Sequence, residues 1–314
     1  MPILTFGLFF IGLTMIVKGG DWFLDSIIWI AEKTGISYGI IGATVVSMAT
    51  TLPELFVSSV ASNEGFTDMA VGNALGSYIC NIAFIIGICA IIKPIKVRDD
   101  YFGVKGALMF GHLSIFYFFA SDGIIGYWEG KILIGLIVLF FIVNLFEYSK
   151  EIEETKKIKT KPRNNKEVLL NGSKFAIGST FIIIGAHILV STGVDIANIF
   201  RIPKQVVSLT LLAIGTSLPE LVTALAATVK DKQNISLGNI LGANILNMTA
   251  VMGISTMVSD SGLIISSQTL RLDVPIATIV ALIFILSGIL FKKIGRITGL
   301  ILLFIYGIYM QILF

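Results

Sequence analysis

The chain has 314 residues, of which 55% are hydrophobic and 14% are charged, and its formal net charge at pH 7 is +3. Soluble domains carry about 25% charged residues, so this chain has too few charges to cover a water-facing surface. The composition excludes a soluble enzyme, a secreted disulfide scaffold and a disordered protein, and the few basic residues form no stripe that would bind nucleic acid.

Ten runs along the chain are long and apolar enough to cross a bilayer, which takes about 20 residues in a helix. They lack the strict alternation of ten-residue strands that a transmembrane barrel requires. The sequence therefore predicts an all-α integral membrane protein with ten transmembrane helices. In chain order the runs are 2–20, 38–62, 69–92, 104–120, 130–148, 168–190, 205–229, 235–258, 272–291 and 295–313.

The basic residues favour one orientation of these helices, because cytoplasmic loops are enriched in Lys and Arg. Most of them lie in the loops between helices 1 and 2, 3 and 4, 5 and 6, 7 and 8, and 9 and 10. The opposite loops hold only Lys131, Arg201, Lys204 and Arg271. We therefore expect a multi-pass protein of the plasma (cell inner) membrane with both termini outside.

The chain divides into two halves of five helices, residues 1–148 and 168–314, joined by a charged segment at 149–167 that we expect to be a cytoplasmic linker. Residues 41–81 align with residues 207–247 without a gap. Because each half has an odd number of helices, the second half enters the membrane from the side opposite to the first. Such inverted repeats are typical of secondary transporters, whose binding site lies near the membrane midplane. The identities include Thr50/Thr216, Pro53/Pro219, Glu54/Glu220, Asn73/Asn239 and Asn81/Asn247.

Glu54 and Glu220 are the acidic residues deep inside the two repeated runs, and neither run has a Lys or Arg near its middle. A carboxylate at the bilayer centre costs several kcal/mol unless it is paired, protonated or bound to a metal. A bound cation is the natural counter-charge. The alternative is a pair of protonated glutamic acids that only pack the helices together.

Each glutamate directly follows a proline, and a leucine separates each proline from two hydroxyl residues, Thr50-Thr51 in one half and Thr216-Ser217 in the other. Proline lacks an N–H and disturbs the carbonyl four residues earlier, so backbone oxygens can line a polar cavity. Carboxylate, hydroxyl, amide and carbonyl oxygens are hard ligands that suit Ca²⁺ or Na⁺. Asn81 and Asn247 are further candidate ligands, and Asn73 and Asn239 are either ligands or helix caps.

These motifs resemble the two α-repeats of the calcium:cation antiporter superfamily, in particular those of prokaryotic sodium/calcium exchangers. The resemblance covers nearly the whole chain and implies a secondary active antiporter that exchanges Na⁺ for Ca²⁺ by alternating access. It also implies that the ions are cargo, that there is no prosthetic group and that the protein is not an enzyme. The lipid bilayer is the expected surrounding, and no protein partner is evident.

The resemblance further implies the roles of single residues. Glu54 and Glu220 would bind both ions, with the carbonyls of Thr50 and Thr216 completing calcium coordination and their hydroxyls serving sodium. Asn81 and Asn247 would flank the central position. The remaining implied site residues are Ser47 and Ala213 through their carbonyls and Ser77, Thr51 and Ser217 through their hydroxyls. Asp21 and His187 lie on helices 1 and 6, which resemble a sliding gate.

Two departures leave the coupling ion open. Several sodium/calcium exchangers have an aspartate where this chain has Asn247, and many have a serine where it has Ala243. Proton-coupled relatives carry a glutamate where this chain has Gly76 and Gly242, which argues against protons. An H⁺-coupled or K⁺-coupled antiporter of the same fold is the alternative, and a channel is disfavoured because channels usually build pores from rings in oligomers.

Overall fold

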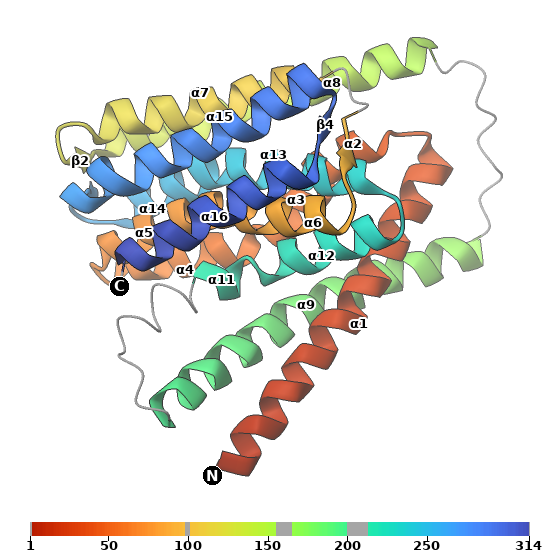
Figure 1. The fold of residues 1–314 in the computed structure, drawn as a ribbon, viewed down its shortest axis with the longest axis horizontal. Helices are drawn as coiled ribbons and strands as arrows, with labels where there is room; N and C mark the ends of the chain where they lie inside the picture. The colour runs from red at the N-terminus through yellow and green to blue at the C-terminus, as the bar shows by residue number, and fades with distance from the viewer. Residues whose placement is uncertain (1, 98–100, 155–164, 200–212, 314) are drawn as a thin grey trace.

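The computed structural model describes residues 2–97, 101–154, 165–199 and 213–313, which are mostly helical (Figure 1). The first half contains α1 (Pro2–Thr34), α2 (Tyr38–Ile41), η1 (Gly42–Val46), α3 (Ser47–Thr50), α4 (Leu52–Asn63), α5 (Thr67–Ile79), η2 (Cys80–Ile86), α6 (Gly87–Ile92), β1 (Ile95–Lys96), α7 (Phe102–Ala120), β2 (Ile124–Ile125) and α8 (Tyr127–Glu154). The second half contains α9 (Asn165–Ile199), α11 (Ala213–Thr216), α12 (Leu218–Val229), α13 (Gln233–Leu246), η4 (Asn247–Val251), α14 (Met252–Val258), β3 (Leu263–Ile264), η5 (Thr269–Asp273), α15 (Val274–Phe291), β4 (Lys293–Ile294) and α16 (Arg296–Leu313).

The prediction of a multi-pass helical membrane protein is confirmed. In the described part of the chain, 8 helices are long and apolar enough to span a membrane, and a ninth candidate is a pair of helices, 38–50 and 52–63, bent by 40°. The remaining predicted run, 205–229, contributes α11 and α12, while its residues 205–212 lie outside the described residues.

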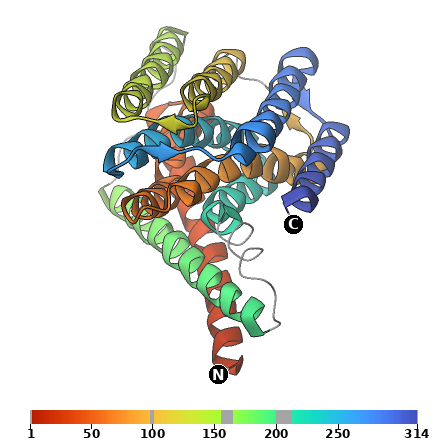
Figure 2. The same cartoon turned by 90° about the vertical axis from the view of Figure 1, so that its left-hand side faces the viewer.

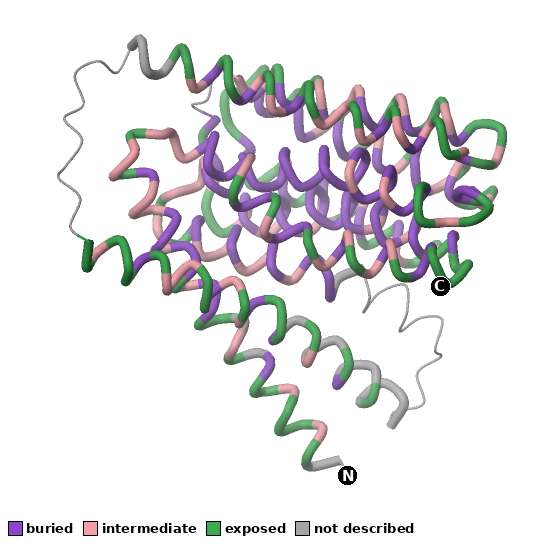
Figure 3. The backbone as a smooth tube through the Cα atoms, turned by 180° about the vertical axis from the view of Figure 1, so that it is seen from behind, coloured by how far each residue is buried: buried purple, intermediate pink, exposed green. Residues whose placement is uncertain are grey.

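Two continuous helical rods form the centre of the molecule. Both begin as α-helices, continue through a π-helical segment and end as α-helices, so that α5, η2 and α6 form one rod and α13, η4 and α14 form the other. In their most apolar windows 72% and 83% of the residues are buried, against 19–44% for the other single spans. Figure 3 shows these buried segments in the middle of the helix bundle. Polar groups on the two rods are therefore shielded from lipid.

Two short antiparallel pairings join the ends of the halves. β1, which follows α6, pairs with β4, which lies between α15 and α16. β3, which follows α14, pairs with β2, which lies between α7 and α8. The same pairing thus occurs twice with the roles of the halves exchanged, and each pair joins two loops that the predicted topology places on the same side of the membrane.

The first helix is longer than predicted. The run 2–20 was expected to end near Lys18-Gly19-Gly20, but α1 continues to Thr34. The glycine does not end the helix because it lies at a crossing with α9, where a Cβ on Gly19 would come within 2.8 Å of the carbonyl oxygen of Gly178. Small residues allow such close approach of membrane helices, and α1 and α9 form a pair that projects from the bundle in Figures 1 and 2.

Gly238 of α13 lies where α13 crosses α2 and η1, and a Cβ there would meet the carbonyl oxygen of Gly39 and, at 2.8 Å, the amide nitrogen of Ala43. Backbone atoms cannot rotate away, so we expect Gly238→Ala to lower the free energy of unfolding by about 1–3 kcal/mol. Gly111→Ala in α7 is the control, because its Cβ would meet no described atom within 4 Å. Melting temperatures in detergent measure both variants, and equal values would contradict the prediction.

Candidate cation site

The two halves break their helices at the same point of the repeated motif. α3 ends at Thr50 and α4 begins at Leu52, while α11 ends at Thr216 and α12 begins at Leu218. Proline lies in the first positions of α4 and α12, where its missing N–H does no harm. Each following glutamate therefore lies in the first turn of a helix, where the helix dipole stabilises negative charge.

Glu54 and Glu220 are both buried, with 0% and 1% of their surfaces exposed. The hydroxyl of Ser77, which contacts Glu54, also lies 3.4 Å from the hydroxyl of Thr216, the last residue before the helix break that precedes Glu220. Oε1 of Glu54 accepts 3.4 Å hydrogen bonds from the hydroxyls of Ser77 and Ser217. Because Ser217 belongs to the second half of the chain, the two halves meet at this carboxylate.

A matched pair of hydrogen bonds crosses between the halves beside the glutamates. Thr50 Oγ1 donates to Oδ1 of Asn239, and Thr216 Oγ1 donates to Oδ1 of Asn73, each at 3.1 Å. Each asparagine also donates from Nδ2 to a hydroxyl in its own half, Asn73 to Ser58 at 2.9 Å and Asn239 to Thr223 at 3.2 Å.

Asn73 and Asn239 therefore use their amides to fix the broken helices. Asn73 also donates to the backbone carbonyl of Glu54 at 3.3 Å. This arrangement agrees with the capping alternative for Asn73. In both asparagines the Oδ1 atom accepts a hydrogen bond from a threonine hydroxyl.

Several oxygens around the glutamates are buried and accept no hydrogen bond within the described chain. Both carboxylate oxygens of Glu220 and Oε2 of Glu54 belong to this set. Its other members are the side-chain oxygens of Thr51, Asn81 and Asn247. Burying a polar group without a partner costs at least about 1–3 kcal/mol, and a charged group costs more. Such a set of hard oxygen atoms can stabilise a desolvated cation.

Asn81 and Asn247 lie at the start of the π-helical segments η2 and η4. Such segments are rare and occur frequently at functional sites, and no sequence pattern used above predicts them. Asn81 follows Ser77 by one turn, so it lies on the face of the rod that contacts Glu54. Both amides are buried, with 0% and 1% of their surfaces exposed.

Of the other predicted site residues, Ser47 is buried, and its carbonyl accepts the N–H of Thr51 at 2.9 Å. Its hydroxyl donates to the carbonyl of Ala43. Ala213 is the first residue of α11, and its side chain lies outside the described part. The charge of the site is limited to the two glutamates, since no group of three His, Cys, Asp or Glu residues that could hold a metal ion occurs among the described residues.

The gate candidates lie on α1 and α9. Asp21 of α1 is 3.6 Å from the ammonium group of Lys230, which follows α12 and also pairs with Asp25 at 2.8 Å. These ion pairs connect α1 to the bundle. His187 is exposed on α9, so the structure does not bring it to the carboxylates.

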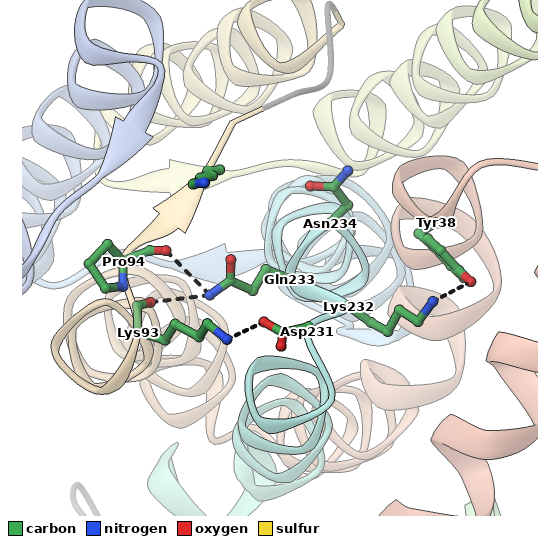
Figure 4. A pocket seen from close by; sticks show the side chains of 8 residues that line it. Tyr38, Lys93, Pro94, Asp231, Lys232, Gln233 and Asn234 are labelled. Atoms are coloured by element: carbon green, nitrogen blue, oxygen red, sulfur yellow. Dashed lines mark hydrogen bonds and ion pairs between the residues drawn. The ribbon is translucent and has the colours of Figure 1, made fainter.

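A cavity of about 500 Å³ opens at one end of the bundle, where β1 and the turn between α12 and α13 meet (Figure 4). Lys93, Lys96 and Lys232 line it together with one acidic residue, Asp231. Lys93 pairs with Asp231, and Lys232 donates to the hydroxyl of Tyr38 at 2.7 Å. A cavity with this excess of positive charge would repel a cation, so it is not a candidate cation site.

Comparison with known proteins gives one consistent result. Residues 4–146 and 173–314 match the model of the family described as sodium/calcium exchanger protein. Sodium/calcium exchanger MaX1 of Methanosarcina acetivorans is 29% identical to this chain, covering 100% of the chain and 99% of that protein. Inner membrane protein YrbG of Escherichia coli is 34% identical over 82% of this chain and 81% of that protein.

Among solved structures, the sodium-calcium exchanger NCX_Mj soaked with 2.5 mM Na⁺ and 10 mM Sr²⁺ superposes on this chain with a TM-score of 0.85. The two chains are 30% identical, and the match covers 99% of each. The overall fold of this chain is thus shared with a structure described as a sodium-calcium exchanger.

Proposed function

The chain belongs to the sodium/calcium exchanger family of the calcium:cation antiporters, and we propose that it exchanges Na⁺ for Ca²⁺ through one midplane site built on Glu54 and Glu220. Both termini would lie outside the plasma membrane, and ten helices in two inverted repeats would give the site alternating access. The paired cross-contacts, Thr50 with Asn239 and Thr216 with Asn73, support the inverted repeat because each contact recurs with the halves exchanged.

The observation that carries the proposal is the set of buried oxygens without hydrogen-bond partners around the two carboxylates. One Ca²⁺ or two Na⁺ would neutralise two ionised glutamates. Because either load leaves the site neutral, the two ions can compete for the same oxygens. Competition for a shared site that opens to one side at a time gives coupled exchange when the unloaded site, with its two uncompensated negative charges, does not change sides.

Gating is part of the same proposal. α1 and α9 pack on each other through Gly19 and Gly178 and through the rings of Phe23 and Phe175, whose centroids are 5.2 Å apart. Such a tightly joined pair can slide as one body along the bundle. Asp21 would hold it in one position through Lys230, and we assign His187 no contact with the ions.

Calcium uptake into proteoliposomes tests the function. Vesicles loaded with Na⁺ and diluted into Na⁺-free buffer containing ⁴⁵Ca²⁺ should accumulate calcium at clamped pH, and vesicles with equal Na⁺ on both sides should not. Two further arms replace the Na⁺ gradient with a K⁺ or an H⁺ gradient. Uptake that follows either of those gradients and ignores Na⁺ would favour the alternative antiporter.

Asn247→Asp tests whether Asn247 belongs to the site. The substitution adds a carboxylate beside two others, so it should strengthen calcium binding or make transport depend more steeply on pH, because like charges favour proton uptake. The calcium concentration for half-maximal uptake, measured between pH 6 and 9, reports both effects. Unchanged values at every pH would place Asn247 outside the site.

A further inference from the structure

Asn244 is a buried residue of α13 that is not among the candidate ligands of the cation site. Its Oδ1 accepts a 2.9 Å hydrogen bond from Nδ2 of Asn81, and its own Nδ2 donates to the backbone carbonyl of Tyr78 at 3.3 Å. The same Nδ2 also lies 3.8 Å from the sulfur of Met109. The amide of Asn244 therefore bridges the two central rods.

The chemistry of these partners fixes which way each amide faces. A backbone carbonyl can only accept, so Asn244 must present its NH₂ group to Tyr78 and its oxygen to Asn81. Asn81 must then present its NH₂ group to Asn244. Its Oδ1 is consequently turned away from Asn244, and it is buried without a hydrogen-bond partner in the described chain.

The equivalent pair in the other half of the repeat differs. Asn247 corresponds to Asn81, and Tyr78 corresponds to Asn244. Neither the amide of Asn247 nor the hydroxyl of Tyr78 has a hydrogen-bond partner among the described residues. A hydrogen bond thus fixes the orientation of the Asn81 amide, and no hydrogen bond within the described chain fixes that of Asn247, although the two asparagines occupy equivalent positions.

We propose that Asn244 is a positioning residue that holds the carbonyl oxygen of Asn81 toward the bound cation. This inference rests on the proposed function, because it needs a cation beside Glu54. A free amide would present its NH₂ group to the cation in part of the population, and that orientation repels the ion. A fixed amide avoids this loss, as outer-shell hydrogen bonds do for metal ligands in general.

The test is ⁴⁵Ca²⁺ binding to the purified full-length protein by equilibrium dialysis. Asn244→Leu keeps the approximate volume and removes the acceptor, and it should weaken calcium binding about tenfold, the lower end of the effect of losing an outer-shell partner. Met109→Leu, which removes only the sulfur contact, is the matched control and should bind like the wild type. If Asn244→Leu does not fold, Asn244→Ala removes the same acceptor without crowding.

A double-mutant cycle separates positioning from a general structural effect. In an Asn81→Ala background, Asn244→Leu should change calcium affinity by less than about twofold, because the residue it positions is absent. An equal loss in both backgrounds, or a folded Asn244→Leu protein with wild-type affinity, would overturn the inference while leaving the proposed function intact. A wild-type protein that binds no calcium would overturn both.

Discussion

Glu54→Gln and Glu220→Gln should each abolish sodium-driven calcium uptake while leaving a folded protein. The substitution keeps the shape of the side chain, removes one negative charge and places an NH₂ group among oxygens that accept no hydrogen bond. A site with a single carboxylate would have to bind Ca²⁺ with a net charge of +1 in a desolvated environment. The expected loss of binding is several kcal/mol, or more than about a thousandfold in affinity.

The measurement is the initial rate of ⁴⁵Ca²⁺ uptake in proteoliposomes, with the amount of folded protein determined by size-exclusion chromatography. Glu64→Gln is the matched control, because Glu64 is exposed at the C-terminal end of the same helix, α4. It should transport at the wild-type rate. Sodium-driven uptake retained by either glutamate variant would refute the assignment of that residue as a ligand.

Much of the candidate site could be predicted because the chain repeats its own motif. A glutamate after a proline inside an apolar run is costly unless it is paired, protonated or bound to a cation, and its recurrence at the equivalent position argues against chance. The structure brings Glu54, Ser77, Thr216 and Ser217 together as the motif indicated. These contacts between the two halves could be predicted because the same residue types occur at equivalent positions in both halves.

Other features depend on contacts that no local pattern encodes. The π-helical segments at Asn81 and Asn247 have the composition of ordinary helix, and the length of α1 depends on a partner helix far away in sequence. The hydrogen bond that orients Asn81 comes from Asn244 of the other half. The repeat does not predict this bond, because the first-half residue equivalent to Asn244 is Tyr78. Only the assembled fold shows such an asymmetry.

One buried ion pair could not be predicted from the charge pattern of the sequence. Lys105 and Glu147 lie near the ends of the predicted runs 104–120 and 130–148, where a charged side chain commonly reaches water. The structure buries both side chains, 0% and 3% exposed, and joins them at 2.5 Å between α7 and α8. α8 continues to Glu154, so Glu147 lies within a helix. A sequence window cannot separate a solvated charge from one that finds a partner on the next helix.

Lys105→Met should consequently be strongly destabilising, although it makes the chain more apolar. The substitution leaves the Glu147 carboxylate buried beside a methionine, and removal of one partner of a buried pair costs about 3–5 kcal/mol. The double variant Lys105→Met/Glu147→Leu removes both charges and should recover most of the stability, since apolar replacement of a whole buried pair is often neutral.

Melting temperatures of the single and double variants in detergent, and their uptake rates at low temperature, test this expectation. The glutamate cluster is built from other helices, so the single variant should transport calcium at the wild-type rate for as long as it stays folded. A single variant as stable as the wild type would mean that water or another side chain compensates Glu147. A double variant less stable than the single would show that the pair itself stabilises the contact between α7 and α8.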